Sequence, residues 1–272
     1  MPTISGMRRL GYTADSIREF CRRVSITRRW NTAEIELLEH CLREDLNKKS
    51  NRALAVLRPI KLVIENYPED QVEYLEAANN PQDGDSGTRK IPFSKELFIE
   101  QDDFMEDPPK KFFRLTVGRE VRLRYGYLIT CTEIIKDPIT DEIIELRCTY
   151  DPETRGGNAP DGRKVKSTIH WVSANHSINA EVRLYERLCL DPEPDISDGN
   201  SLETVLNPNS LEIISSAKVE PSLKESTPGN PIQFERLGYF CLDSEDSNSS
   251  NNLVFNRTVS LRDSWSKIQS QT

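Results

Sequence analysis

The sequence has no apolar run near the roughly 18 residues that a membrane span needs, and no signal peptide is recognisable. Its six cysteines show no CxxC or other metal spacing. The three histidines have no Ser or Cys partner in a recognisable catalytic arrangement, and no carboxylate pair stands out. We therefore expect a cytoplasmic chain with reduced, mostly buried thiols, no bound metal and no catalytic centre.

Apolar residues are also scarce. They make up 36% of the 272 residues, or about 40% with the 12 glycines, against about 45–50% in an average globular chain. Several small, surface-rich modules explain this composition better than one large core. Disorder throughout is the alternative, but Ile, Leu, Val and aromatic residues recur at regular periods, which favours folded modules.

The net charge of −8 is unevenly distributed along the chain. Residues 1–62 carry 13 Lys and Arg against 7 Asp and Glu, whereas the remainder has a net charge of −14. An acidic protein of this kind can still bind RNA at chosen points, because long-range repulsion is screened beyond about 8 Å at physiological salt.

Two amphipathic helices are predicted near the N-terminus, after a basic loop. The first covers residues 13–24, with Thr13 as N-cap and apolar residues at the i, i+3, i+4 and i+7 positions. The second begins near Asn31, with Glu34 three residues on as a capping-box partner, and ends at the NKKS segment.

From Ala53 onward the apolar period changes to two, which is typical of β-strands. The runs form two groups bounded by Pro, Gly, Asn and Asp, and this pattern predicts an antiparallel all-β region of two small barrels. The turn at 136–141 predicts a hairpin, and the polar stretches 79–88, 151–163 and 244–252 are predicted to be loops.

Residues 121–125 (VRLRY) alternate strictly between apolar and basic positions. On a strand, Arg122 and Arg124 share one face about 6–7 Å apart, while Val121, Leu123 and Tyr125 face the core. Guanidinium groups can hydrogen-bond an unstacked base and also lie flat against it. A solvated strand face paired with acidic neighbours is the alternative from spacing alone.

Residues 233–236 (QFER) follow the same logic. Gln233 and Glu235 share a face, and Arg236 lies near Gly238, where the chain can turn toward a ligand. Glutamine offers a donor and an acceptor, which suits the pairing edge of uracil. By contrast, 157–164 (GNAPDGRK) fails as a phosphate-binding loop because Arg163 takes the lysine position, so a charged loop is expected there.

Seven stretches, in this order, resemble the C-terminal half of glutaminyl-tRNA synthetases. They are MPTISGMRRLGYTADSIREFCRRV (1–24), NTAEIELLEHCLREDLN (31–47), KLVIENY (61–67), VRLRYGYLI (121–129), DGRKVKSTIHWVSANH (161–176), QFERLGYFCLDS (233–244) and VFNRTVSLRDSW (254–265). The two ATP-handling signatures of that family, of the HIGH and KMSKS types, occur nowhere in the chain. The resemblance is therefore to the anticodon-binding half.

The resemblance implies a mainly β fold with an N-terminal helical part. A short helical bundle over 1–50 would precede an anticodon-binding region over 51–272. That region would hold two antiparallel six-stranded β-barrels, similar to ribosomal protein L25. A distal barrel (about 90–167) would be inserted into a proximal one (about 51–75 and 168–272).

The resemblance also implies which residues contact RNA. Arg122 and Arg124 would read the first anticodon base, and Arg114 the third, although Phe113 stands where the family often has a basic residue. Gln233, Arg236 and Arg52 would read the middle base.

Arg262 is a weaker candidate for the anticodon loop. The candidates for phosphate contacts, each of which could instead be a solvated charge, are Lys110, Lys111, Arg8, Arg9, Arg22, Arg23, Arg28 and Arg29.

In the intact enzyme, the resemblance implies that ATP and Mg²⁺ are used to activate glutamine and charge the glutamine tRNA. This chain alone is expected to hold no cofactor and to be inactive. Its expected partners are the glutamine tRNA and a catalytic half in cis or in trans, and a monomer is expected. Two alternatives stay open: a free-standing RNA-binding protein of the L25 type, and one half of a split synthetase whose other half docks on segment 1–30.

Overall fold

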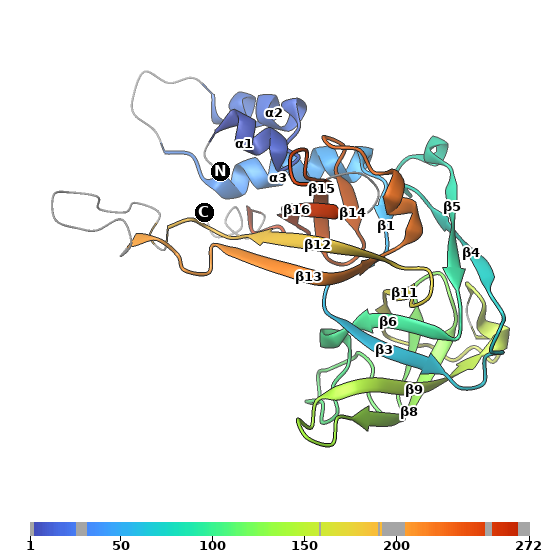
Figure 1. Ribbon diagram of the computed structural model, residues 1–272. Helices are drawn as coiled ribbons and strands as arrows, with labels where there is room; N and C mark the ends of the chain where they lie inside the picture. Colours follow the sequence, from blue (N-terminus) through green and yellow to red (C-terminus); the bar gives the residue numbers. More distant parts are fainter. Residues whose placement is uncertain are drawn as a thin grey trace.

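A computed structural model describes residues 3–25, 32–157, 159–189, 191, 205–247 and 252–265. Within this part of the chain, three helices pack at one end of a first β-barrel, and a second barrel lies beyond it (Figure 1). The mainly β fold with an N-terminal helical part is confirmed. None of the described helices is both long and apolar enough to cross a membrane.

The helices are α1 (Ile4–Arg9), α2 (Ala14–Val24) and α3 (Ile35–Lys49). The cap of α2 is as predicted, since the Thr13 side chain accepts a hydrogen bond from the backbone N–H of Ser16 at 3.1 Å.

Two predictions about the helices are wrong. Helix α1 lies in the expected basic loop, and it escaped notice because six residues are too few to show an apolar period. The predicted start of α3 near Asn31 also fails. Glu34, which was expected inside the first turn, is itself the N-cap with extended backbone and makes no side-chain cap bond; Asn31 lies outside the described residues.

The first barrel is built from β1 (Arg52–Ala53), β2 (Ala55–Val56), β12 (Ile178–Tyr185), β13 (Leu211–Val219), β14 (Ile232–Phe234), β15 (Gly238–Leu242) and β16 (Leu253–Ser260). Its strand order is β1-β14-β15-β16-β12-β13-β2. The segments β1 and β2 are consecutive in the chain but stand at opposite ends of this order. One continuous strand therefore closes the barrel, which has six strands when β1 and β2 are counted as one.

The second barrel has the same design. Its strands are β3 (Pro59–Ile64), β6 (Glu96–Glu100), β7 (Glu120–Leu123), β8 (Leu128–Lys136), β9 (Ile143–Asp151), β10 (Thr168–Ile169) and β11 (Trp171–Ser173). The order β10-β7-β8-β9-β3-β6-β11 again begins and ends with two consecutive segments, separated here by His170. The β8–β9 hairpin confirms the turn predicted at 136–141.

Two details of the barrels differ from the expectation. Each barrel contains two parallel pairs, β1 with β14 and β12 with β16 in the first, and β10 with β7 and β3 with β9 in the second. The sheets are thus mixed. In addition, 59–64 and 168–173 were expected in the proximal barrel but pair within the second one. Alternation shows which face of a strand is apolar, and it does not show which sheet the strand joins.

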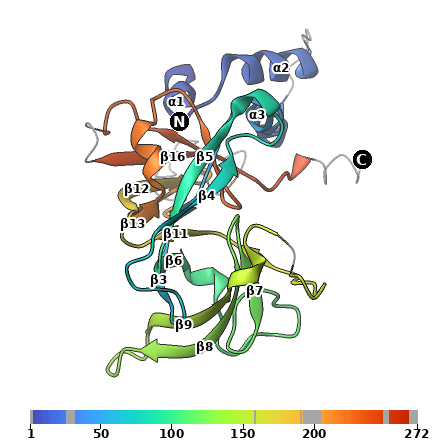
Figure 2. The same cartoon turned by 90° about the vertical axis from the view of Figure 1, so that its right-hand side faces the viewer.

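A separate hairpin connects the two barrels with the helices. It consists of β4 (Glu73–Ala78) and β5 (Thr88–Phe93), and Figure 2 shows it rising from the second barrel toward α3. At its tip, Asn80 Nδ2 donates to the carbonyl of Lys48 at 2.9 Å, and the backbone N–H of Arg52 donates to the carbonyl of Asn79 at 2.6 Å. The predicted loop at 79–88 therefore holds the end of α3.

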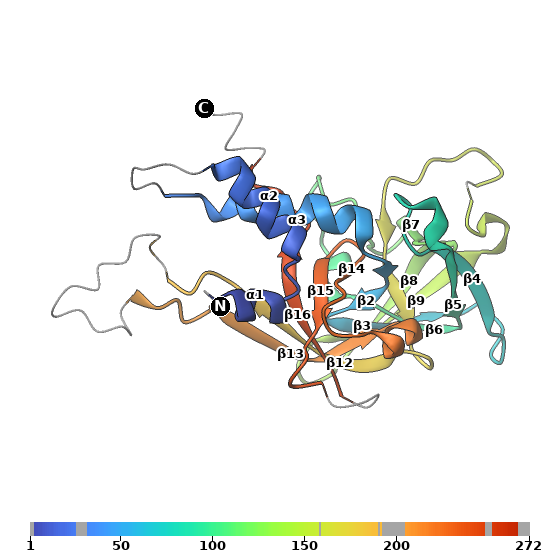
Figure 3. The ribbon, with the colours of Figure 1, turned by 90° about the horizontal axis from the view of Figure 1, so that it is seen from above.

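Each barrel has its own apolar core, as the low apolar content predicted. Trp171 and Phe93 centre the second core in an edge-to-face contact, and Phe234 and Phe240 stack in the first. Helix α3 packs through Leu42 on the outer side of the first barrel, against Tyr239 of β15 and Val259 of β16 (Figure 3). All six cysteines are free thiols.

Candidate nucleic-acid interface

Most of the predicted base-reading residues meet where the two barrels touch. We call this region the barrel junction; it comprises Glu100–Asp103, Arg114, Arg124, Tyr125, His170 and Gln233–Arg236. Its centre is the tight turn between β14 and β15, where Arg236 has a φ of 69°. A positive φ is uncommon outside glycine, and here it aims the Arg236 side chain away from the first barrel and toward the second.

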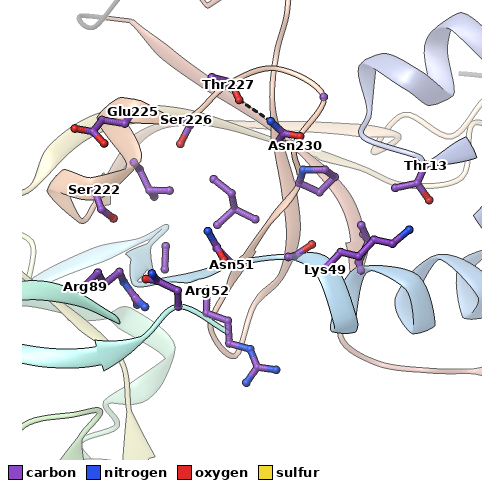
Figure 4. Close-up of a pocket in the computed structure, with 18 residues that line it drawn as sticks. Thr13, Lys49, Asn51, Arg52, Arg89, Ser222, Glu225, Ser226, Thr227 and Asn230 are labelled. Atoms are coloured by element: carbon purple, nitrogen blue, oxygen red, sulfur yellow. Dashed lines mark hydrogen bonds between the residues drawn. The ribbon is translucent and has the colours of Figure 1, made fainter. Parts of the chain in front are cut away.

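Arg52 and Gln233 lie side by side because β1 pairs with β14 in parallel, with Arg52 opposite Gln233. Among the described residues, Arg52 Nε and Gln233 Oε1 are buried and have no hydrogen-bond partner. Buried polar atoms in proteins are nearly always satisfied, so an adjacent unpaired donor and acceptor indicate a place for a polar ligand or water. Arg52 also lines a cavity of about 590 Å³, with Arg89 close by and residues 222–230 across from them (Figure 4).

Arg236 forms a bidentate ion pair across the junction. Its two terminal nitrogens donate to Asp103 Oδ2 at 2.5 Å and Oδ1 at 2.7 Å, and Nη1 also lies 2.8 Å from His170 Nδ1. Asp103 and His170 are each only 1% exposed, whereas the Arg236 side chain is 30% exposed. The guanidinium is thus fixed from behind while part of it still faces solvent.

Arg114 reaches the same carboxylate from the second barrel. Its Nε lies 3.4 Å from Asp103 Oδ1, and its Nη1 donates to the carbonyl of Asp102 at 2.9 Å. Arg114, Arg236 and Lys111 together line an open cleft of about 790 Å³. The cleft therefore brings together two predicted base readers and one predicted phosphate contact.

Arg124 is held by a different carboxylate. Its Nε donates to Glu235 Oε2 at 2.7 Å, and its guanidinium lies 4.9 Å from the ring centroid of Tyr125, whose hydroxyl donates to Glu235 Oε1. Behind this group, the largely buried Arg89 donates to Glu220 at 2.6 Å. Ion pairs at the junction thus connect the two barrels and the hairpin.

Arg122 and Arg124 have different hydrogen-bond partners. As predicted, Val121 and Leu123 are fully buried, but β7 ends at Leu123 and Tyr125 takes a positive φ of 64°. The turn comes after Arg124, because the backbone N–H groups of Arg122 and Arg124 both donate to the neighbouring strand, to the carbonyls of Ser167 and Ile169 at 2.9 Å. Arg122 Nη1 donates to the carbonyl of Thr154 at 3.2 Å. Burial lowers the pKa of Arg122, and nearby Glu120 offsets this only in part. One arginine face along 121–125 stays a prediction.

Other predicted contacts lie away from the junction. Arg9 is 22% exposed and is bound by three carboxylates, Asp243 at 2.8 Å, Asp246 at 2.9 Å and Glu245 at 3.0 Å, so it anchors α1 to the first barrel.

The remaining basic candidates vary in their surroundings. Arg22 and Arg23 pair with Glu19 on α2 itself. Lys110, Arg8 and Arg262 are exposed, and Arg28 and Arg29 lie outside the described residues.

Sequence reasoning missed the residues that hold the arginines. Asp103, His170 and Glu235 are separated from their partners by 66 to 133 positions, and no local pattern links them. The one available signal was a polar residue inside an apolar run, as at His170 before Trp171.

Nothing in the described part of the chain resembles a metal or nucleotide-phosphate site. It contains no group of three or more His, Cys, Asp or Glu side chains placed to hold a metal ion. Arg163, in the segment that resembles a phosphate-binding loop, donates to Glu120 at 3.0 Å and also pairs with Asp151 and Asp161. That segment is a charged loop, as predicted.

The chain also resembles known proteins along most of its length. A family model described as tRNA synthetases class I (E and Q), anti-codon binding domain, matches residues 50–151, and a second model with the same description matches 168–243. Together they cover more than half of the chain.

Curated relatives agree with this match. They include the glutamine–tRNA ligases of Nitrobacter hamburgensis (53% identical over 268 residues), Bradyrhizobium diazoefficiens (54% over 267) and Vibrio campbellii (51% over 271). These alignments include 98%, 98% and 100% of this chain but 47%, 47% and 48% of the relatives, so the chain spans about half their length. The chain belongs to the family of anticodon-binding domains of class I (E and Q) tRNA synthetases.

Proposed function

We propose that the chain binds the anticodon loop of a glutamine tRNA, as the anticodon-binding part of a glutamine–tRNA ligase. The observation that carries this proposal is the unpaired donor on Arg52 beside the unpaired acceptor on Gln233. The pairing edge of uracil offers an acceptor and a donor to match them. The middle base of the glutamine anticodons CUG and UUG is a uracil.

The surrounding arginines fit the neighbouring bases. Arg236 would help to read the middle base, Arg114 the third and Arg124 the first, each from a fixed position at the barrel junction. Single-stranded bases are commonly read by guanidinium groups that hydrogen-bond and stack on them. Arg122 would contact the first base together with Arg124, with its Nη1 also donating to the carbonyl of Thr154.

Phosphate contacts would come from exposed lysines and arginines. Lys111 lines the cleft beside Arg114, and Lys110 precedes it in an exposed turn. Arg8 and Arg262 are exposed candidates that lie away from the junction. We do not propose Arg9 as a phosphate contact, because three ion pairs occupy its guanidinium.

The ligation itself would take place elsewhere in a full-length enzyme. There, ATP and Mg²⁺ would activate glutamine, and a catalytic half in cis or in trans would complete the protein in the cytoplasm, as a monomer. Among the described residues, no group of His, Cys, Asp or Glu side chains is placed to hold a metal ion. No specific observation favours a free-standing RNA-binding role.

Base-specific variants test the proposal. Arg236→Ala and Gln233→Ala should each reduce the preference for uracil at the middle position by about 1–3 kcal/mol, while Arg124→Ala should relax the first position. The measurement is binding of anticodon stem-loop RNAs that differ at one base. Variants that weaken all RNAs alike and leave every base preference intact would contradict the proposal.

A further inference from the structure

We propose that the buried carboxylate of Asp103 positions two base-reading arginines, Arg236 and Arg114, and thereby couples recognition of two adjacent anticodon bases. The inference rests on the proposed function and adds a residue that touches no RNA itself. Asp103 is a positioning residue in this account. It acts through the two guanidinium groups that it holds.

The geometry around Asp103 is that of a shared anchor. Both of its oxygens accept hydrogen bonds from Arg236, at 2.5 and 2.7 Å, and Arg114 Nε approaches Oδ1 at 3.4 Å. The two arginines come from different barrels, Arg236 from the first and Arg114 from the second. One carboxylate thus fixes side chains that no strand pairing brings together.

The backbone fixes the carboxylate in turn. Asp103 ends a short 3-10 helix (Gln101–Asp103), and its carbonyl accepts a hydrogen bond from the backbone N–H of Leu115 at 3.0 Å. Leu115 is the residue after Arg114, so this backbone hydrogen bond ties the anchor to the residue next to one of its arginines. The Asp103 side chain is 2% exposed and has little freedom to follow a moving partner.

His170 also holds Arg236, next to Asp103. An arginine can only donate, so His170 Nδ1 must accept from Arg236 Nη1, and the ring proton then sits on Nε2, which faces Glu100 Oε1 at 3.4 Å. Glu100 in turn accepts from the backbone N–H groups of Leu57 and Arg58, in the link between β2 and β3. The contacts around Arg236 therefore extend, through His170 and Glu100, to the chain segment that joins the barrels.

Fixing both arginines before RNA binds has a physical benefit. A long side chain loses conformational freedom when it is immobilised on binding, and a preformed ion pair removes much of that cost. The side chains of Arg236 and Arg114 are 30% and 44% exposed, and both line the cleft of about 790 Å³. Their free N–H groups are thus presented together. Without Asp103, both should lose their orientation.

Arg124 offers a matched comparison within the same junction. It is held by Glu235, which is also buried, and no hydrogen bond or ion pair joins it to Asp103. Loss of the Asp103 charge should therefore spare the base that Arg124 reads. Loss of the Glu235 charge removes a buried carboxylate of the same kind and should affect the first position.

The test compares Asp103→Asn, Glu235→Gln and Arg236→Ala in the full 272-residue chain. For each, the ratio of dissociation constants is measured between the cognate stem-loop and stem-loops changed at the first, middle or third anticodon base. We expect Asp103→Asn to lower the middle and third ratios together by about tenfold and to keep the first. Glu235→Gln should lower the first ratio and keep the third.

A thermal melt of each variant shows whether it is folded, and the three ratios then separate a positioning defect from a structural one. A structural defect would weaken all three ratios alike, whereas a positioning defect is confined to two of them. If Arg236→Ala lowers the middle ratio but Asp103→Asn changes neither the middle nor the third, the positioning role is wrong and the proposed function stands. If Arg236→Ala changes no ratio, the proposed function itself fails, and this inference with it.

Discussion

Gln233 and Arg52 show at the scale of single residues how a binding surface differs from a structural one. A buried polar atom without a partner costs about 1–3 kcal/mol, and Arg52 and Gln233, which lie opposite each other on paired strands, each carry one. The cost is understandable if a ligand satisfies both atoms. Stability and binding should then respond in opposite directions to substitution.

Replacement of Gln233 by Met tests this trade-off. Methionine has a similar shape and no strong acceptor, so Gln233→Met should keep or raise the free energy of unfolding, by up to about 1 kcal/mol, because the unpaired acceptor is removed. The same change should reduce the preference for uracil at the middle position. Chemical denaturation and stem-loop binding measure the two effects. A variant that loses stability and keeps its base preference would show that Gln233 is structural.

The arginines of the junction could be found from the sequence, but their partners could not. Alternation and the family resemblance singled out Arg124 and Arg236. Asp103 and Glu235, which hold them, lie more than a hundred positions away, so their roles depend on how the barrels dock. For the same reason the sequence could not show that Arg9 is neutralised by three carboxylates.

At the scale of secondary-structure elements, strand β7 carries alternating residues with different roles, apolar ones in the core and charged ones at the surface. Leu123 is fully buried in the second barrel, and the preceding Arg122 is half-buried at its surface. Leu123→Ala should lower the free energy of unfolding by about 3 kcal/mol because it leaves a cavity. Arg122→Ala, the control, should cost clearly less. Thermal and denaturant melts of both variants measure these losses. If Arg122→Ala lowered the free energy of unfolding more than Leu123→Ala, the assignment of Leu123 to the core and Arg122 to the surface would be wrong.

Helix α1 is anchored by the ion pairs of Arg9, and the one with Asp243 is the most buried. Six residues cannot sustain a helix alone, and Arg9 binds Asp243, whose side chain is fully buried. Burial raises the pKa of Asp243, but hydrogen bonds from Arg9, Asn256 and two backbone N–H groups outweigh it, so the pKa lies well below its usual value. The pair therefore stabilises the fold when Asp243 is ionised.

Arg9→Met should accordingly destabilise the chain in a pH-dependent way. The loss should be about 3 kcal/mol at neutral pH, because a buried carboxylate loses its nearest cation and keeps only Arg183, whose Nη1 lies 4.0 Å away. Since the folded pKa is depressed, wild-type stabilisation is complete above the unfolded pKa of about 4 and is lost as the pH falls below it. The difference between wild type and variant should thus shrink in acid. Melts with exposed Arg8→Met as control check this, and a difference independent of pH would contradict it.

The elements themselves were largely predictable, and their partners were not. Apolar periods located α2, α3 and most strands, because each period reflects burial of one face. The stretches 59–64 and 168–173 were assigned to the wrong barrel, since an alternating strand fits either core and only its pairing decides. The parallel pairs likewise join strands that are distant in the sequence, each pair within one barrel.

For the whole molecule, charge placement matters more than net charge. The chain is acidic overall, and much of its basic N-terminal part is neutralised by internal ion pairs, such as those of Arg9, Arg23 and Lys49. We therefore expect RNA binding to depend on cations that are not neutralised in this way, among them those that face the cleft. Lys111 lines it, and Lys110 adjoins it.

Substitution of these lysines should reveal their role through salt dependence. Lys110→Ala or Lys111→Ala should weaken binding to all stem-loops alike and reduce the log–log salt slope by about 0.7, since each would remove one phosphate contact. Lys61→Ala serves as control, because Lys61 is paired with Glu96 at 2.7 Å on the barrel wall. Titrations at several salt concentrations measure the slopes. A lysine variant that changed the preference between bases would contradict the phosphate role.

The central claim is that the anticodon lies at the barrel junction, and a photo-crosslink tests it most directly. A stem-loop with 4-thiouridine at the middle anticodon position is irradiated on the 272-residue chain, and the crosslinked peptide is identified by mass spectrometry. The account predicts crosslinks within β1 or the 232–237 segment, next to Arg52, Gln233 and Arg236, and their loss when the same label is placed in the stem. Crosslinks confined to the helices or to the outer strands β8 and β9 would contradict it.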